Sequence, residues 1–340
     1  MTFNIILTVD YPRMPVDDRI IKEAGGIFIK RPSKTEDELI AATKDADAVI
    51  TMNQVFSKKI IDYLERCRII SSLGIAYNNI DVSAATQGGI CVTNTPDFCL
   101  EEVSDHAMAL LLACARKLVV FDNASKTGKW DSEQAPKIHA LLSPMSRLRG
   151  QVVGLVGFKK IAKTLVPKVR GFGLNIIAYD PIVPDAEIKE SGVEPVDFNR
   201  LLKESDYILL REIPTDSKTF HFFGEEQFKK MKPTAYFINT GRGTLVDEKA
   251  LCMALIEKRL AGAGLDGLEN EPPDPNNPLF KMDNVIISAH SAYYSEQSQI
   301  DIRQAPIENI LQAIYGKFPS DCVNPEVKEK FIARWGSKYL

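Results

Sequence analysis

Short runs of apolar residues alternate along the chain with longer segments whose apolar positions recur at a helical period. In the first hundred residues, β-type runs are separated by amphipathic segments such as 35–45 (TEDELIAATKD) and 57–67 (SKKIIDYLERC). The β-type runs are 4–10, 26–32, 47–52, 68–74 and 90–96. Strands that alternate with helices predict a parallel sheet covered by helices.

The second half of the chain repeats this alternation. Residues 101–121 (EEVSDHAMALLLACARKLVVF) predict one long helix, with acids in its first turn and basic residues near its end, as the helix dipole favours. A polar loop around Trp130 follows, and residues 295–316 predict a last helix before a polar tail. The new β-type runs are 152–157, 175–180, 207–210, 235–241, 261–267 and 284–290. The pattern therefore predicts an α/β protein with two doubly wound parallel sheets joined by long helices.

Composition narrows the class of protein. A chain of 340 residues is long enough for two domains with sizeable cores. The net charge of -3 gives no electrostatic reason to expect nucleic acid or an anionic membrane as a partner. No apolar run approaches the roughly 20 residues that a bilayer span needs, and the start, MTFNIILTVDYP, is typical of a strand rather than a signal peptide. We expect a cytoplasmic protein.

Cysteine and histidine usage gives no sign of disulfides or metal. The six cysteines contain no C-x-x-C pair and lie mostly in apolar segments, which is typical of reduced core thiols. No two of the four histidines have the spacing of metal ligands, so the sequence predicts no metal site.

Polar residues stand at the ends of the expected strands of the second series. Asp180, Arg242, Asp266 and His290 each close or follow one of these runs. Because ligands of such sheets bind beyond the carboxyl ends of the strands, four polar residues at one edge predict an active site.

The residue types suggest acid–base chemistry on an anionic substrate. His290 is a candidate general acid/base, because imidazole titrates near neutral pH. Glu271 could orient it and stabilise its charge, and Glu269 competes for that role. Arg242 lies between glycines on a turn, where its planar fork of donors suits a carboxylate beside a carbonyl. Taken singly, each residue also has an ordinary explanation, as a structural histidine, a solvated loop acid or a surface arginine.

The stretch GFKKIA at 157–162 stands where a dinucleotide-binding turn would have G-x-G-x-x-G. Gly157 occupies the first glycine position, while Lys159 and Ala162 replace the second and third. Asp180 follows Gly157 by 180 − 157 = 23 residues, close to the roughly 20 expected for the acid that binds the adenosine ribose. That carboxylate favours NAD over NADP, because it repels a 2′-phosphate.

Several motifs in series resemble the D-2-hydroxyacid dehydrogenase family, which includes phosphoglycerate dehydrogenase. The resemblance covers nearly the whole chain and is strongest toward the family's C-terminal binding protein branch. The motifs are NTPDFCLEEVSDHAMALLL (94–112), NTGRGTLVDEKAL (239–251), GAGLDGLENEPP (262–273) and NVIISAHSAYYSEQS (284–298).

The resemblance implies an NAD-dependent oxidoreductase acting on a small 2-hydroxy or 2-oxo acid. Arg242 would hold the substrate carboxylate and carbonyl, and Glu271 would pair with the proton-transferring His290. The implied fold has a flavodoxin-like substrate domain built from residues 1–104 and 296–340, and a Rossmann-type NAD-binding domain at residues 105–295. It also implies a homodimer formed through the cofactor domain.

The resemblance also implies the binding residues. For NAD these are the phosphate turn, the ribose acid and two residues at the far strand ends, of which Asp266 would contact the nicotinamide amide: Gly157, Lys159, Lys160, Ile161, Asp180, Thr240 and Asp266. For the substrate they are a loop with backbone donors and an aromatic residue after the histidine: Ile75, Ala76, Tyr77 and Tyr293.

Three departures from the family pattern keep a second function open. Lys159 either fills the phosphate site and excludes NAD, or turns outward and adds charge to it. The family's L-H-x-P histidine is missing, with the gap at Arg211 or Glu212, and Pro167 falls inside an expected helix. The alternative is therefore a cofactor-independent or non-redox enzyme, or a binding protein, that kept the fold.

Overall fold

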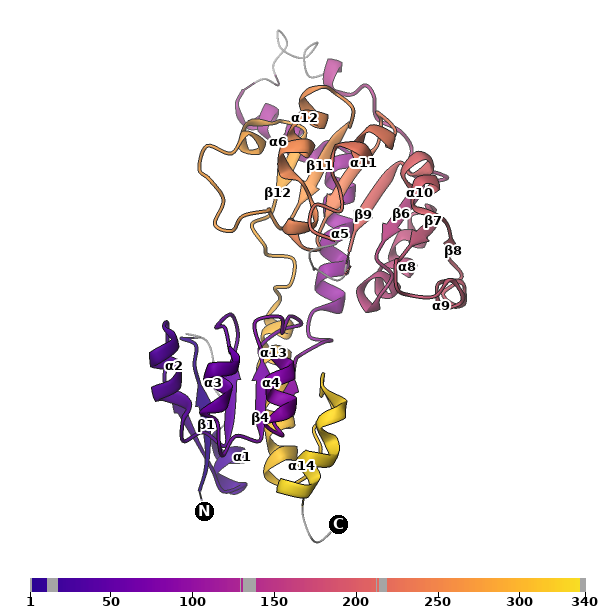
Figure 1. Cartoon of the computed structure of the whole chain (residues 1–340). Helices are drawn as coiled ribbons and strands as arrows, with labels where there is room; N and C mark the ends of the chain where they lie inside the picture. Colours follow the sequence, from indigo (N-terminus) through magenta and orange to yellow (C-terminus); the bar gives the residue numbers. More distant parts are fainter. Residues whose placement is uncertain are drawn as a thin grey trace. The chain divides into compact units, whose positions relative to one another are not determined.

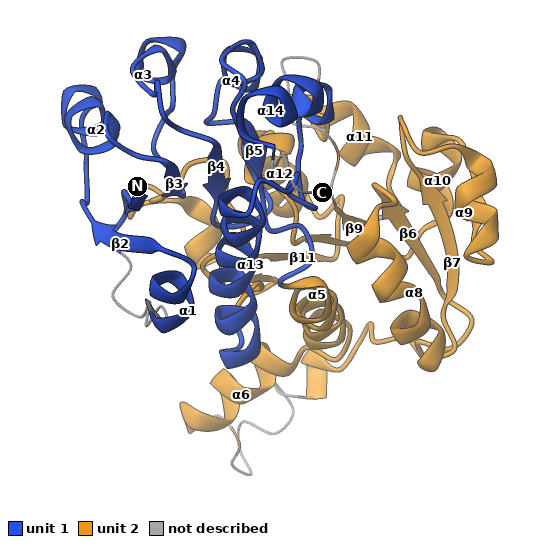
Figure 2. Ribbon diagram, turned by 90° about the horizontal axis from the view of Figure 1, so that it is seen from below, with its two compact units in different colours: residues 1–98, 295–340 blue, residues 99–294 orange. Residues whose placement is uncertain are grey.

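The computed structural model describes residues 2–10, 18–128, 130, 139–211, 213 and 219–336. They form two compact units, residues 1–98 with 295–340 and residues 99–294 (Figure 2). The first boundary lies six residues before the expected 104/105, because helix α5 (Leu100–Ala115) packs along its length against β10, β11 and β12 of the second unit. The two units are described separately below.

The first unit is a five-stranded parallel sheet with strand order β2-β1-β3-β4-β5. This is the order of flavodoxin-like folds. Its strands are β1 (Phe3–Leu7), β2 (Gly26–Lys30), β3 (Ala48–Thr51), β4 (Ile69–Ser72) and β5 (Cys91–Thr93). Its helices are α1 (Asp18–Glu23), α2 (Glu36–Thr43), α3 (Lys58–Asp62), α4 (Val82–Gln87), α13 (Glu296–Ile314), η3 (Pro325–Val327) and α14 (Lys328–Trp335).

The second unit is a seven-stranded parallel sheet with strand order β12-β11-β10-β9-β6-β7-β8. Counted from β6, this is the 3-2-1-4-5-6 order of dinucleotide-binding folds with one strand added. Its strands are β6 (Val152–Val156), β7 (Asn175–Tyr179), β8 (Glu194–Pro195), β9 (Tyr207–Leu210), β10 (Tyr236–Asn239), β11 (Gly262–Leu265) and β12 (Val285–Ile287). Its other helices are α6 (Leu118–Lys126), α8 (Lys160–Gly171), α9 (Asp185–Glu190), α10 (Phe198–Glu204), α11 (Glu225–Lys230), η1 (Gly243–Leu245), α12 (Glu248–Ile256) and η2 (Pro278–Lys281).

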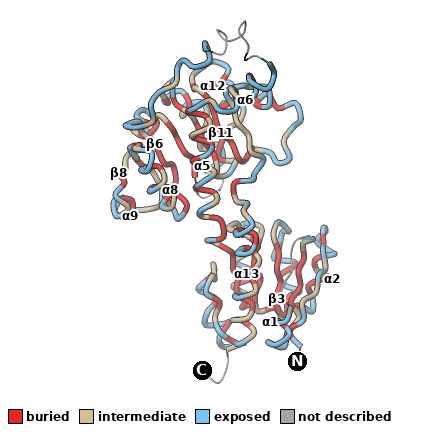
Figure 3. Tube along the Cα trace, turned by 180° about the vertical axis from the view of Figure 1, so that it is seen from behind, coloured by how far each residue is buried: buried red, intermediate tan, exposed pale blue. Residues whose placement is uncertain are grey.

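The strands form the core of each unit, as expected for parallel sheets covered on both faces. In Figure 3 the central strands of both units are coloured as buried, while exposed residues lie mostly in helices and loops. All four residues of β3, β4, β9 and β11 are buried. Both faces of each sheet are covered by helices, and this explains why the strands have near-continuous apolar sequences. The predicted α/β class with two parallel sheets is confirmed.

Two helical segments differ from the expectation. The expected single helix at 101–121 is two helices, α5 and α6, because Lys117 between them takes a left-handed backbone with φ of 52°. The expected polar tail contains α14, which is anchored because Phe331 is completely buried. A polar segment can thus form a helix where it packs on the rest of its unit, here through buried Phe331 and through Arg334, which donates to the carbonyls of Gly88 and Glu65.

The cysteines form no disulfide, and burial suppresses the reactivity of those in the core. All six are free thiols, and five of them are buried. Desolvation raises the pKa of both Cys67 and Cys114 to about 12, so these thiols stay protonated near neutral pH. No helix in the described part of the chain is long and apolar enough to cross a bilayer.

Candidate active site

The polar residues singled out in the second series follow the carboxyl ends of strands in one sheet. Asp180 follows β7, Arg242 follows β10, Asp266 follows β11 and His290 follows β12 (Figure 1). All these strands are parallel, so the four residues lie along the same edge. Strands β10, β11 and β12 are consecutive neighbours, whereas β7 lies beyond β9 and β6. The edge therefore carries two groups of residues, one on each side of the sheet's midpoint.

His290 is held by Glu271. Its Nδ1 lies 2.6 Å from Glu271 Oε2, and Leu268 donates its backbone N–H to the other carboxylate oxygen over 3.1 Å. Both side chains are close to half exposed, so the imidazole is accessible to a ligand. A carboxylate accepts hydrogen bonds only, so Nδ1 carries a proton and Nε2 is the nitrogen left for chemistry.

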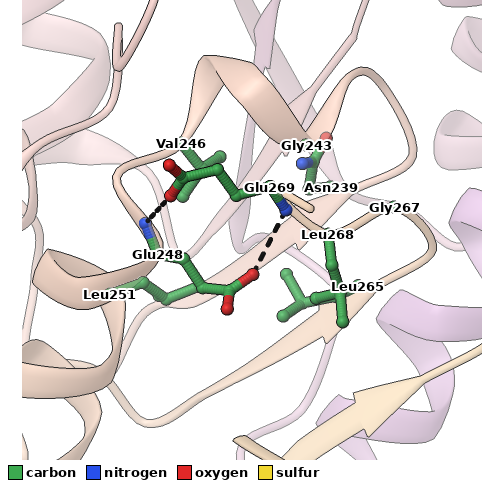
Figure 4. Close-up of a pocket in the computed structure, with 9 residues that line it drawn as sticks. All are labelled: Asn239, Gly243, Val246, Glu248, Leu251, Leu265, Gly267, Leu268 and Glu269. Atoms are coloured by element: carbon green, nitrogen blue, oxygen red, sulfur yellow. Dashed lines mark hydrogen bonds between the residues drawn. The ribbon is translucent and has the colours of Figure 1, made fainter. Parts of the chain in front are cut away.

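Glu269 has other partners. One of its carboxylate oxygens lies 2.9 Å from His221 Nε2, and the other accepts the backbone N–H of Glu248. Glu248 in turn accepts the backbone N–H of Glu269, so that each carboxylate is hydrogen-bonded to the main chain of the other residue (Figure 4). Of the two acids that competed for His290 in the sequence, Glu271 is the one that contacts it.

Arg242 lies on a turn that packs tightly beside the Glu271 loop. A Cβ at Gly243 would come within 1.9 Å of the Leu268 carbonyl oxygen, so only glycine allows this approach. Asn239 ties the turn together, because it accepts from Gly241 and donates to the Arg242 carbonyl. The Arg242 side chain is exposed and has no hydrogen-bond or ion-pair partner among the residues that the structure describes. Its fork of donors is available to an anion.

The expected substrate loop of the first unit uses its carbonyls internally. The carbonyls of Gly74, Ile75 and Ala76 accept from Thr95, Asn94 and Ser72 respectively. Within the described ranges, the backbone N–H groups of Ile75, Ala76 and Tyr77 have no partner. A row of unengaged N–H groups in a half-exposed loop favours an anion such as a carboxylate.

The phosphate turn keeps a usable backbone despite its altered sequence. Gly157 has a φ of 91°, which favours glycine, whereas Lys159 has a φ of −99°, which any residue adopts. The Lys159 side chain is exposed and has no partner in the described part of the chain, and helix α8 begins at the next residue. Ala162 is buried in the core between α8 and the sheet. The helix N-terminus therefore offers its backbone donors to a diphosphate.

Asp180 holds the phosphate turn from the neighbouring strand. Its Oδ2 accepts the Phe158 N–H over 2.6 Å, and its Oδ1 accepts the N–H groups of Ile182 and Val183. A carboxylate has about four acceptor positions, so one on Oδ2 remains for a ribose hydroxyl. The turn, the helix N-terminus and this acid together fit an adenine dinucleotide.

Arg211 is a buried residue whose contacts sequence reasoning missed. Its side chain is 1% exposed, and its Nη1 donates to the carbonyl oxygen of Thr240 over 3.0 Å and to the Thr240 hydroxyl. It thus fixes the residue two positions before Arg242. Glu212, the other place for the missing family histidine, lies outside the described residues. The only signal for Arg211 was a charged residue inside the apolar context YILLREIP.

The remaining expected residues have these positions. Tyr293 presents its ring edge-on to His290, with centroids 6.4 Å apart. The carboxylate of Asp266 is buried and accepts hydrogen bonds from the 288–292 loop. Helix α8 runs through Pro167, which lies on its exposed side, where water can satisfy the freed carbonyl. The described residues contain no group of three His, Cys, Asp or Glu side chains placed to hold a metal.

Known proteins share this arrangement over most of the chain. Residues 108–292 match the family described as D-isomer specific 2-hydroxyacid dehydrogenase, NAD binding domain. A glyoxylate reductase of Korarchaeum cryptofilum is 38% identical over 290 residues, covering 85% of this chain and 86% of that protein. A D-3-phosphoglycerate dehydrogenase of Methanocaldococcus jannaschii is 34% identical over 319 residues, covering 93% of this chain and 59% of that protein.

Solved structures agree with the sequence relatives. The structure of a glyoxylate reductase from Paecilomyes thermophila matches with a TM-score of 0.84 and 26% identity, covering 95% of this chain and 98% of that one. The fold and the sequence matches define a two-domain α/β oxidoreductase that uses NAD. The chain belongs to the D-isomer specific 2-hydroxyacid dehydrogenase family. The family, the cofactor and the reaction class expected from the sequence are confirmed.

Proposed function

We propose that the protein reduces a small 2-oxo acid, with glyoxylate as the first candidate, to its 2-hydroxy acid. The observation that carries this proposal is the short contact between His290 Nδ1 and Glu271, which leaves Nε2 as the proton donor. Glyoxylate is suggested by relatives that are named glyoxylate reductase and cover most of this chain. NADH, when bound, supplies the hydride for the carbonyl carbon of the substrate.

His290 completes the reduction with a proton. As the carbonyl carbon gains a hydride, the carbonyl π electrons move to oxygen and form an alkoxide. His290, doubly protonated, transfers the Nε2 proton to that oxygen and becomes neutral, while its Nδ1 proton stays with Glu271. The carboxylate stabilises the imidazolium before transfer, because its charge is opposite and only 2.6 Å away. A proton from solvent then restores the starting state.

Arg242 holds the substrate carboxylate in this proposal. Support comes from its exposed guanidinium, which has no partner among the described residues. The unengaged N–H groups of Ile75, Ala76 and Tyr77 make that loop of the first unit a candidate anion-binding segment by itself. A guanidinium binds a carboxylate through two parallel hydrogen bonds, which fixes the direction of the adjacent carbonyl. Lysine cannot reproduce that geometry.

The proposal is tested by comparing Arg242→Lys with His290→Asn in an NADH oxidation assay with glyoxylate. Asparagine tolerates the left-handed backbone of residue 290, where φ is 53°, so this variant removes Nε2 with little strain. We expect kcat to fall on the order of 100-fold or more in His290→Asn, as for a lost general acid. Arg242→Lys should raise KM for glyoxylate by about tenfold or more, as expected for a lost charged hydrogen bond.

A contrary result has a clear reading for each residue. Wild-type kcat in His290→Asn would remove His290 from proton transfer, and an unchanged KM in Arg242→Lys would remove the carboxylate contact. Failure of the native protein to oxidise NADH with any small 2-oxo acid would contradict the proposed reaction itself. In that case the cofactor-independent alternative would be the better explanation.

We propose a homodimer formed through the second unit. Support comes from a hollow of about 630 Å³ lined by the end of α5, the start of α6 and the amino ends of β9, β10 and β12. Leu118, Leu141 and Leu142 are exposed large apolar side chains at or beside it. Apolar surface of this kind is typical of protein interfaces. A monomeric mass in sedimentation at micromolar concentration would contradict this assembly.

We propose a cytoplasmic enzyme without nucleic acid or membrane partners, supported by the six free thiols and the net charge of -3. Fractionation of cells that produce the protein tests this location. The likeness to the C-terminal binding protein branch stays a prediction from the motif HSAYYSEQ at 290–297. The relatives named above are a reductase and a dehydrogenase, and this supports an enzyme rather than a binding protein.

A further inference from the structure

The loop that carries His290 is organised around Asp266. This side chain is 5% exposed, and its Oδ1 accepts the Ser288 hydroxyl over 2.7 Å and the Ser291 N–H over 2.9 Å. Ala292 donates its N–H to both carboxylate oxygens, over 3.2 and 3.1 Å. The backbone carbonyl of Asp266 also accepts the N–H of His290 over 2.6 Å. One acid thus receives hydrogen bonds from both sides of the histidine.

The loop needs such support because its backbone is unfavourable. Ala289 and His290 both lie in the left-handed region, with φ of 52° and 53°. For residues other than glycine this conformation costs on the order of 1 kcal/mol or more each, and it persists only where the surroundings impose it. The hydrogen bonds of Asp266 are the contacts that impose it here. If they loosen, the direction of the His290 imidazole changes.

A second histidine completes this network from helix α5. His106 is half-buried, and its Nε2 lies 2.7 Å from Ser288 Oγ and 3.6 Å from Asp266 Oδ1. The single hydroxyl hydrogen of Ser288 goes to the carboxylate, so Ser288 can only accept from the imidazole. His106 Nε2 must therefore carry a proton and donate it. This fixes the order of donors as His106, then Ser288, then Asp266.

We propose that His106 is a positioning residue for His290, acting through Ser288 and Asp266. The inference rests on the proposed role of His290 in proton transfer. His106 belongs to α5, which packs against β10, β11 and β12, so it connects the catalytic loop to a helix that is packed on the sheet. Its hydrogen bond directs the Ser288 hydroxyl to Asp266, and Asp266 then holds the strained backbone. His106 itself does not touch the reacting atoms.

The test compares His106→Leu with His106→Gln. Glutamine places an amide N–H where the imidazole Nε2–H was, whereas leucine fills similar space and donates nothing. We expect kcat for glyoxylate reduction to fall about tenfold in His106→Leu, the loss typical of one hydrogen bond to a charged group or its relay. KM and NADH affinity should stay within about twofold, and His106→Gln should recover most of kcat.

A double variant tests whether the residues act in series. Ser288→Ala should lower kcat about as much as His106→Leu, and His106→Leu with Ser288→Ala should be no worse than either alone. His221→Asn is the matched control, because His221 is also a half-buried histidine beside a carboxylate, that of Glu269, and asparagine tolerates its left-handed backbone, where φ is 55°. We expect it to affect the melting temperature as His106→Leu does, but to leave kcat within about twofold.

The outcomes separate this inference from the proposed function. The positioning role would be overturned if His106→Leu kept the wild-type kcat, or if the His221 control lost as much kcat as His106→Leu. It would also be overturned if the losses of kcat in the two single variants multiplied in the double variant. Loss of kcat in His106→Gln equal to that in His106→Leu would do the same. These readings require that His290→Asn is inactive. Full activity in His290→Asn would instead overturn the proposed function, together with the inference that depends on it.

Discussion

The two sides of the second unit's sheet edge are built by different rules. On the β10–β12 side, the functional groups are held by other side chains. Glu271 contacts the His290 imidazole, and Asp266 accepts hydrogen bonds from the 288–292 loop. On the β6–β7 side, the turn offers its backbone and the helix N-terminus, and Lys159 extends into solvent. Proton transfer depends on the identity and direction of a side chain, whereas diphosphate binding depends mainly on main-chain geometry. Changes in sequence are therefore better tolerated on the cofactor side.

After loss of His290 itself, the largest expected effect lies on the catalytic side, at Glu271. Glu271→Gln removes the charge that stabilises the His290 imidazolium, so kcat should fall about 10- to 100-fold in the glyoxylate assay. Glu269→Gln is the matched control from the same loop. Its carboxylate contacts His221 and Glu248 instead, so kcat should stay within about twofold. Equal losses in both variants would mean that the loop as a whole, and not the contact with His290, sets the rate.

A smaller effect is expected at Asp180, where a side chain supports the cofactor turn. Asp180→Ala removes the acceptor for a ribose hydroxyl and also releases the Phe158 N–H. NADH should bind about 10-fold more weakly, as judged by fluorescence titration, because one charged hydrogen bond is lost and the turn loosens. Asp185→Ala, five residues further on and exposed, is the control and should leave binding unchanged. Unaltered affinity in Asp180→Ala would place the adenosine ribose elsewhere.

The smallest effect is expected at Lys159. Its backbone conformation suits any residue, so Lys159→Gly should change NADH affinity by less than about fivefold, the range of one exposed charge. Lys159→Ala separates charge from bulk, since it removes the ammonium group but keeps the Cβ. Weaker binding in both variants, with an affinity in the wild type that falls as salt rises, would show that the charge assists. Tighter binding in Lys159→Gly alone would show that the Cβ crowds the phosphate.

Much of this architecture follows from local sequence pattern. Apolar runs that alternate with amphipathic segments predicted both parallel sheets, because strands covered by helices on both faces are almost always apolar along their length. The strand-end positions of Asp180, Arg242, Asp266 and His290 followed from the same pattern. The lysine at 159 looked disruptive in the sequence, yet its φ of −99° shows a backbone that does not need glycine. A motif records residue types, and it does not record the dihedral angles that make those types necessary.

The remaining features depend on contacts between distant segments. Residue spacing could not show whether Glu269 or Glu271 contacts His290. The structure shows that Glu269 contacts His221 instead, and that the loop brings Glu271 to His290. His106 is 182 residues from Ser288, and nothing local marks the pair. The break at Lys117 was missed because the run from 101 to 121 keeps a helical composition, while the helix ends through a single left-handed residue. Burial of Arg211 likewise depends on its partner Thr240, which directly follows the neighbouring strand β10.

The loop at Ile75–Tyr77 presents main-chain groups, and this affects how the site can be studied and how it can evolve. A surface made of backbone N–H groups is the same whatever side chains it carries, so alanine scanning would pass over it without a signal. Proline at position 76 is the replacement that deletes one of these donors. For the same reason, a different side chain at Ala76 would change the shape around a bound anion while keeping the donors. Neutral drift in such a loop can therefore retune which acids fit without first losing the capacity to bind one.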